Sequence, residues 1–276
     1  MLGLALLIGC GPTPTEFRAE ECRADARPIV DPGPGEITWT TQVVRLNLLP
    51  EAYEAIDAIG LAPVEDLIVE GIRMHVREGL APYDFAVVLD DVEAAEANLE
   101  QLMTFDVTGD DPNGLGLLAH VTMTGKDTGN VTRNEHFGPF HEEAAFEGFP
   151  PFGGIFVSSH FQPELQSAWP EQADCLGDVV PALGGDVSIE TLPADEAERV
   201  ASVVAALLAS SIVHETGHAV GLTADDPERA HLVGDNGCVM DNGGNVDFLE
   251  RARLAEEPLR WCPASADYLA SILPPR

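Results

Sequence analysis

The stretch His214-Glu-Thr-Gly-His-Ala-Val-Gly221 has the form H-E-x-x-H-x-x-G and stands at the end of a long apolar segment. On an α-helix, residues four apart share one face, so the imidazoles of His214 and His218 can bind the same Zn²⁺ ion. Glu215 follows the first histidine and is placed to take a proton from a zinc-activated water. Gly221 permits a left-handed turn that ends the helix and directs the chain back towards the metal.

The residues before this motif predict a buried helix. Residues 200–213 are all apolar or small, so most of the helix is expected to lie in the core. We expect the helix to begin near Ala194 or Asp195, just after Pro193. Polar His-Glu-His at the end of a buried helix would be costly without a partner such as a metal ion. The context therefore favours a zinc site over a chance cluster of polar residues on a surface helix.

The motif resembles that of the metzincin clan of zinc metallopeptidases. In that clan the extended form H-E-x-x-H-x-x-G-x-x-H, or -D, is followed by a tight turn with a methionine under the metal. Residues 238–242, Cys-Val-Met-Asp-Asn, are similar to this Met-turn, with Met240 as its methionine, and are most like the archaemetzincin and matrixin-like branches. Over residues 37–276 the resemblance implies an α+β metzincin-like zincin domain. Its expected parts are a twisted mixed sheet, a buried active-site helix, the Met-turn and a C-terminal helix.

The sequence departs from the clan at the third zinc ligand, where Ala224 stands in the expected position. His231 lies nine residues before Met240, close to the interval of the clan, so an insertion before His231 would explain the departure. Asp225 or Asp226 is the alternative ligand, because some small metzincins use an aspartate one turn after the glycine. Imidazole suits zinc at least as well as carboxylate does, and we expect His231 to be the ligand.

The resemblance implies a zinc-dependent endopeptidase. With three protein ligands and an open fourth position, zinc lowers the pKa of its water to about 7, and Glu215 acts as general base. The tyrosine that some metzincins carry after the methionine is missing, because Asp241 and Asn242 stand there. Two alternatives stay open. One is a catalytically silent zinc-containing binding or structural lipoprotein, and the other is a gluzincin-type hydrolase with Glu250 as third ligand.

Hydrophobic patterns outside the motif predict the remaining elements. Strands are expected at 37–48, 85–89, 115–124 and 154–159, and a helix at 63–79. Residues 106–153 are rich in Gly, Asp, Asn, Thr and His, and are expected to form long loops and an edge strand beside the cleft. This segment also offers ligands for a second Zn²⁺ or a Ca²⁺ ion, although solvated loop histidines are the simpler interpretation. The candidates are His120, His136 and His141 with Asp110 or Asp127.

The amino terminus is similar to a bacterial lipoprotein signal. A short apolar run ends in Leu7-Ile-Gly-Cys10, which resembles a lipobox, and this implies that Cys10 is lipidated and becomes the first mature residue. We therefore expect a monomer anchored by lipid in the bacterial cell envelope, on the periplasmic or extracellular face. The expected divisions are a signal peptide over 1–9, a proline-rich tether over 10–36 and the peptidase domain over 37–276.

The cysteine count agrees with export. If Cys10 carries lipid, four of the five cysteines remain, and an even set can form disulfides in three ways. We favour Cys238 with Cys262, which would join the Met-turn to the C-terminal segment. That choice leaves Cys22 to pair with Cys175.

The composition limits the partners. The chain has 14 Lys and Arg against 47 Asp and Glu, for a formal net charge of -33. Nucleic-acid binding needs a basic face, so nucleic acid is excluded and a peptide or protein substrate is expected. We interpret the acidity mainly as a device for solubility in a salty habitat.

Overall fold

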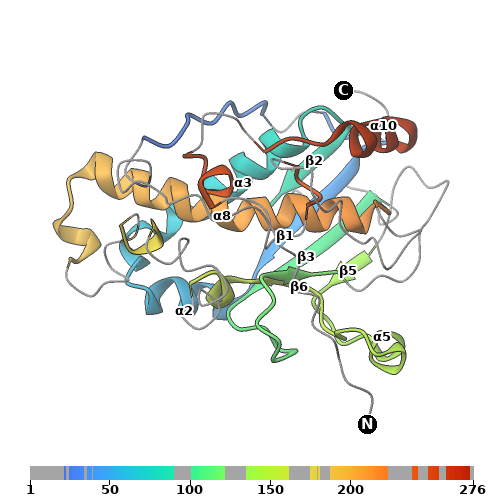
Figure 1. Ribbon diagram of the computed structural model, residues 1–276, viewed down its shortest axis with the longest axis horizontal. Helices are drawn as coiled ribbons and strands as arrows, with labels where there is room; N and C mark the ends of the chain where they lie inside the picture. The colour runs from blue at the N-terminus through green and yellow to red at the C-terminus, as the bar shows by residue number, and fades with distance from the viewer. Residues whose placement is uncertain are drawn as a thin grey trace, which may run out of the picture.

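The structure is a computed structural model of an α+β protein, built around a mixed sheet and one long buried helix (Figure 1). It describes residues 22, 25–33, 36–38, 40–89, 101–121, 135–161, 175–178, 180, 187–222, 238–241, 248–254 and 259–273. The predicted α+β class, with a mixed sheet and a buried helix, is confirmed.

Within the described residues the sheet has six strands, in the order β2-β1-β3-β6-β4, and β5 also pairs with β3. Strand β1 pairs in parallel with β2 and β3, and β3 pairs in parallel with β5 and β6. Strand β4 pairs antiparallel with β6 at the edge. Parallel strands covered on both faces are expected to be continuously apolar. All four residues of β2 are accordingly buried. The bounds are β1 (Gln42–Leu48), β2 (Phe85–Val88), β3 (Leu102–Thr108), β4 (Ala119–His120), β5 (Glu135–Phe137) and β6 (Gly154–Phe156).

Two long helices, α3 (Glu65–Leu80) and α8 (Ala194–Ala219), pack against each other, and Figure 1 shows α8 crossing the middle of the molecule. Side chains of β1 that face the helices, such as Val44 and Leu46, belong to the main core, whereas Val43 belongs to a small second core. The other helical elements are α2 (Pro50–Ala58), α5 (Glu142–Glu147), α9 (Phe248–Arg251), α10 (Pro263–Ile272) and the 3-10 turns η1 (Ala62–Val64), η3 (Val157–His160) and η5 (Ile189–Thr191). The predicted C-terminal helix is confirmed by α10.

Helix α8 is the core helix that the apolar segment predicted, and its start at Ala194 is confirmed. By length and composition alone it could cross a membrane, but 83% of its most apolar window is buried inside the protein. A helix that is apolar on all sides can be buried either in the core of a large protein or in a membrane. Here the partners are α3, η3 and strands of the sheet.

Two glycines let α3 and α8 approach closely. A Cβ on Gly71 would lie 2.7 Å from the Cβ of Ala205, and a Cβ on Gly79 would lie 2.8 Å from Val213 Cγ2. The two glycines are eight residues apart, and so are their partners, in the same direction along the chain. The two helices therefore run parallel to each other along this contact.

We expect Gly71→Ala to lower the free energy of unfolding. Alanine favours a helix over glycine by about 1 kcal/mol, but forcing a methyl into a filled contact costs about 1–3 kcal/mol. The clash is with another Cβ, which cannot move aside, so a net loss of up to about 2 kcal/mol is expected. Urea unfolding measures it. Gly177→Ala is the control, because its Cβ would meet nothing within 4 Å. A stabilised Gly71→Ala would contradict the close helix contact.

Several predicted boundaries need correction. The strand expected at 37–48 begins at Gln42, and the strand expected at 154–159 ends at Phe156 and continues as η3. The strand expected at 115–124 is limited to β4 within the described residues. The Asp111 carboxylate accepts hydrogen bonds from the backbone of Asn113, Leu115 and Leu117 and so folds that stretch into a loop. The helix at 63–79 is confirmed as the end of η1 and most of α3, and the strand at 85–89 is confirmed as β2.

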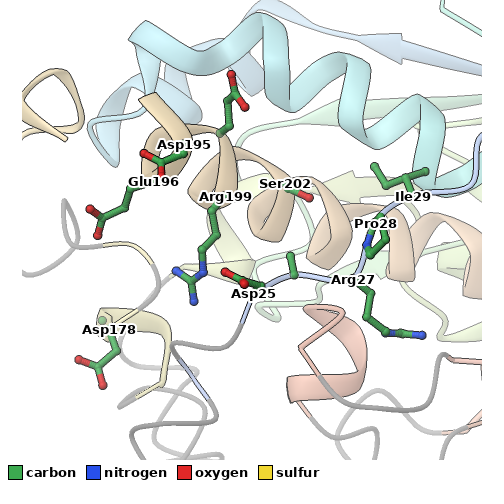
Figure 2. A pocket seen from close by; sticks show the side chains of 12 residues that line it. Asp25, Arg27, Pro28, Ile29, Asp178, Asp195, Glu196, Arg199 and Ser202 are labelled. Atoms are coloured by element: carbon green, nitrogen blue, oxygen red, sulfur yellow. The ribbon is translucent and has the colours of Figure 1, made fainter. Parts of the chain in front are cut away.

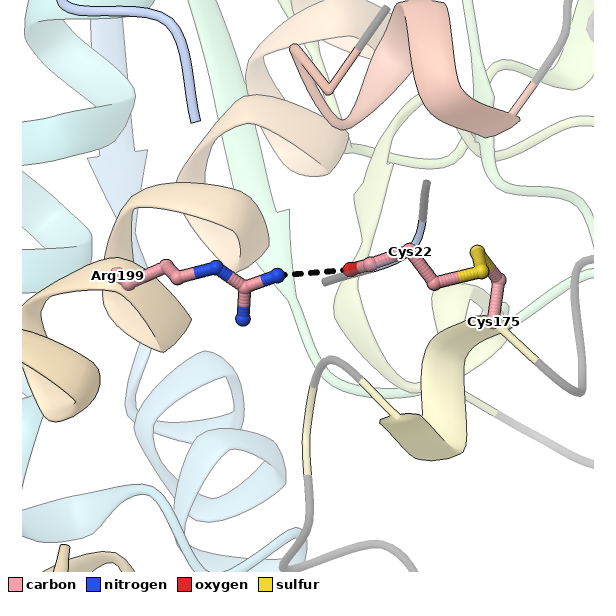
Figure 3. Close-up of a disulfide and its surroundings, with 3 residues drawn as sticks. All are labelled: Cys22, Cys175 and Arg199. Atoms are coloured by element: carbon pink, nitrogen blue, oxygen red, sulfur yellow. Dashed lines mark hydrogen bonds between the residues drawn. A yellow bond between two sulfur atoms is a disulfide. The ribbon is translucent and has the colours of Figure 1, made fainter. Parts of the chain in front are cut away.

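Both predicted disulfides are confirmed, Cys22 with Cys175 and Cys238 with Cys262, each with Cα atoms 5.3 Å apart. Figure 3 shows Arg199 of α8 donating a hydrogen bond of 2.7 Å to the Cys22 carbonyl oxygen. The backbone N–H of Arg27 donates to the carbonyl of Arg253 at 3.0 Å. The described part of the predicted tether therefore lies against the domain from Cys22 onwards.

Candidate metal centre

The carboxyl end of α8 closes in a tight left-handed turn. Gly221 has a φ of 97°, so the turn predicted at this glycine is confirmed. Its N–H donates to the His218 carbonyl at 2.9 Å, and the N–H of Leu222 donates to the Gly217 carbonyl at 2.9 Å. This is the Schellman arrangement, which satisfies the last carbonyls of a helix. It brings the Leu222 carbonyl back to the side chain of His218.

The two histidines are held by backbone carbonyls and face each other. His214 Nδ1 lies 2.6 Å from the Val239 carbonyl oxygen, and His218 Nδ1 lies 3.3 Å from the Leu222 carbonyl oxygen. The two Nε2 atoms are 3.0 Å apart. His218 is buried, while His214 is partly exposed.

These contacts assign the ring protons. A carbonyl oxygen only accepts hydrogen bonds, so each neutral imidazole carries its proton on Nδ1. If both rings are neutral, the lone pairs of the two Nε2 atoms then face each other, which is unfavourable unless a proton or a metal cation lies between them. Two nitrogens at about 2.0–2.1 Å from a tetrahedral zinc are about 3.4 Å apart. A small rotation of either ring reaches that separation, so the two histidines fit a metal ion.

Glu215 presents a buried carboxyl group next to this pair. The residue is 7% exposed. Burial raises the pKa of Glu215 to about 8, and a hydrogen bond from the backbone of Val121 opposes the rise. Val121 directly follows the edge strand β4, so this strand end fixes the carboxyl group. A dication beside the carboxyl would favour its charged form and lower the pKa.

The segment that carries Met240 packs under the motif. The N–H of Asp241 donates to the Cys238 carbonyl at 3.1 Å, which makes a turn, and the N–H of Val239 donates to the Arg260 carbonyl at 2.9 Å. Met240 is fully buried, and a methyl on Gly217 would overlap its sulfur. Met240 therefore lies against the helix between the two histidines. The Cys238–Cys262 disulfide ties this turn to the start of α10.

Three further residues support the site without having been predicted from the sequence. Tyr268 of α10 donates from its hydroxyl to the Val220 carbonyl at 2.9 Å, at the end of α8. The indole N–H of Trp261 donates to the Gly79 carbonyl at 2.9 Å, and Val121 holds Glu215. None of these residues has a spacing relative to the motif that reveals its role. An aromatic residue with a polar tip near a helix end is the one general signal available.

The third-ligand candidates His231, Asp225 and Asp226 lie outside the described residues, as do Ala224, Asn242 and Cys10. Within the residues that are described, no group of three or more His, Cys, Asp and Glu side chains could hold a metal ion. The described part of the centre is therefore the histidine pair with Glu215. Glu250, the gluzincin-type candidate, is in α9 and lines a cavity whose described lining contains none of His214, Glu215 and His218.

The candidates for a second metal site are only partly brought together. His136 Nε2 lies 2.8 Å from an oxygen of Asp106, and His141 Nε2 lies 3.3 Å from the His136 carbonyl oxygen. Asp106 was not among the predicted ligands. Burial lowers the pKa of His120, which lies in β4, while Asp110 is exposed and Asp127 is outside the described residues.

An acidic pocket of about 810 Å³ lies at the other end of α8, against residues 25–29 (Figure 2). Glu198, which lines the pocket, is 16 residues before His214, so the two are about 24 Å apart along the helix axis. The acidic pocket is therefore separate from the histidine pair.

Chemically, the centre offers two imidazole nitrogens for a divalent metal and a buried carboxyl group for proton transfer. The carbonyl partners of the two Nδ1 atoms fix ring orientation in the way that metal-binding histidines require. Comparisons with protein-family models, with curated proteins and with solved structures found no match to this chain.

Proposed function

We propose that the protein is a zinc-dependent endopeptidase of the metzincin type, with His214 and His218 as ligands and His231 as the third. One observation carries the proposal. The Nε2 atoms of the two histidines face each other at 3.0 Å, while both Nδ1 atoms are occupied by carbonyl oxygens. A pair so oriented is suited to a cation, and histidine nitrogens are ligands that zinc prefers.

Glu215 is the residue proposed to move protons. When bound, zinc would supply a Lewis acid that makes water nucleophilic near neutral pH. Glu215 accepts a proton from the attacking water as the water oxygen bonds to the scissile carbonyl carbon. It then donates that proton to the nitrogen as the C–N bond breaks, so an amine and a carboxylic acid result. The hydrogen bond from Val121 keeps the carboxyl in place for both transfers.

The edge strand β4 supports a peptide as the substrate. It stands at the end of the strand order, and the residue that follows it contacts Glu215. An extended peptide can add to a sheet edge through its main-chain hydrogen bonds. A peptide lying along β4 would bring a backbone carbonyl towards the carboxyl group of Glu215. This favours hydrolysis of chain-internal peptide bonds.

We further propose that the protein acts in the cell envelope, attached by lipid at Cys10. Two disulfides agree with an oxidising compartment, although they do not specify which one. The lipid itself is supported by the sequence at residues 7–10 alone.

Metal removal tests the proposal. Purified protein is expected to contain one zinc per chain by elemental analysis and to cleave members of a quenched-fluorescence peptide library. Chelation with phenanthroline should abolish the cleavage, and stoichiometric zinc should restore it. Zinc without cleavage of any peptide would favour the silent binding module. Cleavage that persists in metal-free protein would refute the zinc mechanism.

A further inference from the structure

Residues 138–153, called the lobe below, leave the sheet between two halves of one strand position. Strand β5 pairs with residues 103–105 of β3 and β6 pairs with residues 107–108, both in parallel and both on the edge of β3 that β1 does not occupy. The chain therefore follows β3, departs after Phe137 and returns at Gly154. Figure 1 shows helix α5 of the lobe standing out from the body of the molecule beyond β5 and β6.

The base of the lobe is joined to the rest of the fold by specific contacts. A Cβ on Gly138 or on Gly154 would overlap Asp106 of β3, so the chain closes tightly on this strand where it departs and where it returns. The side chain of Asn113 donates a hydrogen bond to the Phe152 carbonyl at 3.0 Å and accepts one from the Phe152 N–H at 3.0 Å. The base of the lobe is therefore held in one position relative to the sheet.

The lobe exposes large aromatic side chains. Phe146 is 93% exposed, Phe140 is 55% exposed and Phe149 is 48% exposed. The part of the chain that the structure describes exposes eight large hydrophobic residues, and three of them are these phenylalanines, within ten residues of sequence. Apolar side chains that stay in water contribute little to the stability of the fold. Their concentration on one projecting segment indicates an interaction surface.

The base of the lobe lies beside the strand end that contacts Glu215. Gly154 is the register partner of His120 in β4, and a Cβ on Gly153 would lie 3.1 Å from the His120 carbonyl oxygen. The next residue, Val121, provides the backbone hydrogen bond to Glu215. Because β4 runs antiparallel to β6, the lobe leaves the sheet at the end of β4 that is nearest to Glu215. A peptide lying along β4 and continuing past Glu215 would therefore approach the lobe.

The charges of the lobe indicate which kind of peptide it fits. Helix α5 contains Glu142, Glu143 and Glu147, and residues 138–153 contain no lysine or arginine. The whole chain, with every residue counted, has a formal net charge of -33. Complementary charge favours encounter, while like charge disfavours a partner. A basic peptide segment is therefore favoured over an acidic one. A bilayer fits less well, because three carboxylates accompany Phe146 in one short helix and are costly to remove from water.

We propose that the lobe is an exosite of the peptidase, which binds a substrate segment that combines basic residues with a large apolar side chain, several residues away from the scissile bond. Phe140, Phe146 and Phe149 would contact the apolar side chain. The inference rests on the proposed function, because it names the substrate class of the same centre. Binding energy that is equal in the ground state and the transition state lowers KM without raising kcat. The exosite should therefore act on KM alone.

A binding experiment tests the lobe without using cleavage. The probe is the rhodamine-labelled hexapeptide Lys-Phe-Lys-Lys-Phe-Lys, and Lys-Ser-Lys-Lys-Ser-Lys is the matched peptide of equal charge. All proteins in this titration carry Glu215→Gln, so that cleavage cannot remove the probe. By fluorescence anisotropy, the protein with an intact lobe should bind the first peptide at least about tenfold more tightly than the second, as expected of an aromatic hot spot.

The Phe146→Ser/Phe149→Ser double variant should lose this preference between the two peptides. Phe146→Ser alone should lose part of it, and because Phe146 is almost fully exposed, its replacement should leave the unfolding midpoint in urea unchanged. Leu67→Ser is the matched control, since Leu67 is another exposed apolar residue but belongs to α3. This control should keep the preference of the protein with an intact lobe.

A cleavage experiment tests the same surface on a substrate. A short peptide that the wild-type protein cleaves is extended, at one end or the other, by Gly-Gly-Lys-Phe-Lys or by Gly-Gly-Lys-Ser-Lys. One extension with phenylalanine should lower KM at least about fivefold at unchanged kcat, and the double variant should not respond to it. Zinc content should be the same in both proteins.

Failure of the exosite and failure of the peptidase give different results. If the lobe selects the phenylalanine probe but the protein cleaves nothing, the proposed function is wrong and the lobe is still a peptide-binding surface. If short peptides are cleaved but neither the probes nor the extensions are distinguished, the exosite alone is refuted. Without a preference between the probes, binding to phosphatidylcholine vesicles that the double variant loses would make the lobe a membrane contact, and a dimer that this variant dissolves would make it a contact between copies. Either result overturns the proposal.

Discussion

Glu215→Gln is expected to keep its zinc and to lose peptide cleavage by about 10²- to 10⁴-fold in kcat, the usual contribution of a general acid–base residue. Glutamine has nearly the same shape and still accepts the hydrogen bond from Val121, but it cannot accept the proton of the attacking water. The histidines proposed to hold the metal are unchanged in this variant. Zinc content by elemental analysis and kcat on one peptide substrate together measure the effect.

Glu198→Gln is a matched control for this substitution. Glu198 is also in α8 but is exposed near the amino end of the helix. Its replacement should change neither zinc content nor kcat. Cleavage by Glu215→Gln at the wild-type rate would remove Glu215 from the mechanism, while loss of zinc in that variant would make Glu215 a ligand.

His231→Ala is expected to lose most of its zinc affinity, because it removes the proposed third ligand. Removing a residue that only supports a ligand weakens metal affinity by about 10- to 100-fold, and loss of a ligand should exceed that range. Asp225→Ala and Asp226→Ala should keep both zinc and activity. Competition titration with a fluorescent zinc chelator gives the three affinities.

The same titration can give the opposite answer. If His231→Ala binds zinc like the wild type while one aspartate variant is metal-free, the insertion account is wrong and that aspartate is the ligand. If all three variants bind zinc normally, the third ligand is elsewhere. Loss of both zinc and cleavage in His214→Ala and His218→Ala provides the reference for complete ligand removal.

The elements that the sequence predicted well are those specified by local pattern. Helix α8 begins directly after Pro193, its apolar residues 200–213 are mostly buried, and it ends at Ala219, just before Gly221, which adopts a positive φ. The disulfides could be predicted because only three pairings were possible once Cys10 was set aside. In each case a few neighbouring residues, or a small number of alternatives, determined the result.

Features that depend on contacts between distant residues were missed. Strand β3 was not predicted, because Thr104 and Asp106 interrupt its apolar pattern, and residues 106–108, which end the strand, were assigned to the loop-rich segment 106–153. The Asp106 carboxylate instead accepts a hydrogen bond from the Asn47 side chain and lies within hydrogen-bond distance of His136 Nε2, and both residues are far away in the sequence. The contact of Val121 with Glu215 arises because β4 turns antiparallel at the sheet edge. No local pattern encodes such a contact.

The disulfide between Cys22 and Cys175 would also limit how far the domain lies from a lipid carried at Cys10. A free tether over residues 10–36 would extend to about 90 Å, at about 3.4 Å per residue. Cys22, however, is buried and bonded to the domain, so only the twelve residue steps from Cys10 to Cys22 can extend. Their limit is about 40 Å. If Cys10 carries the lipid, the protein would work close to the bilayer surface, on substrates within about one protein diameter of it.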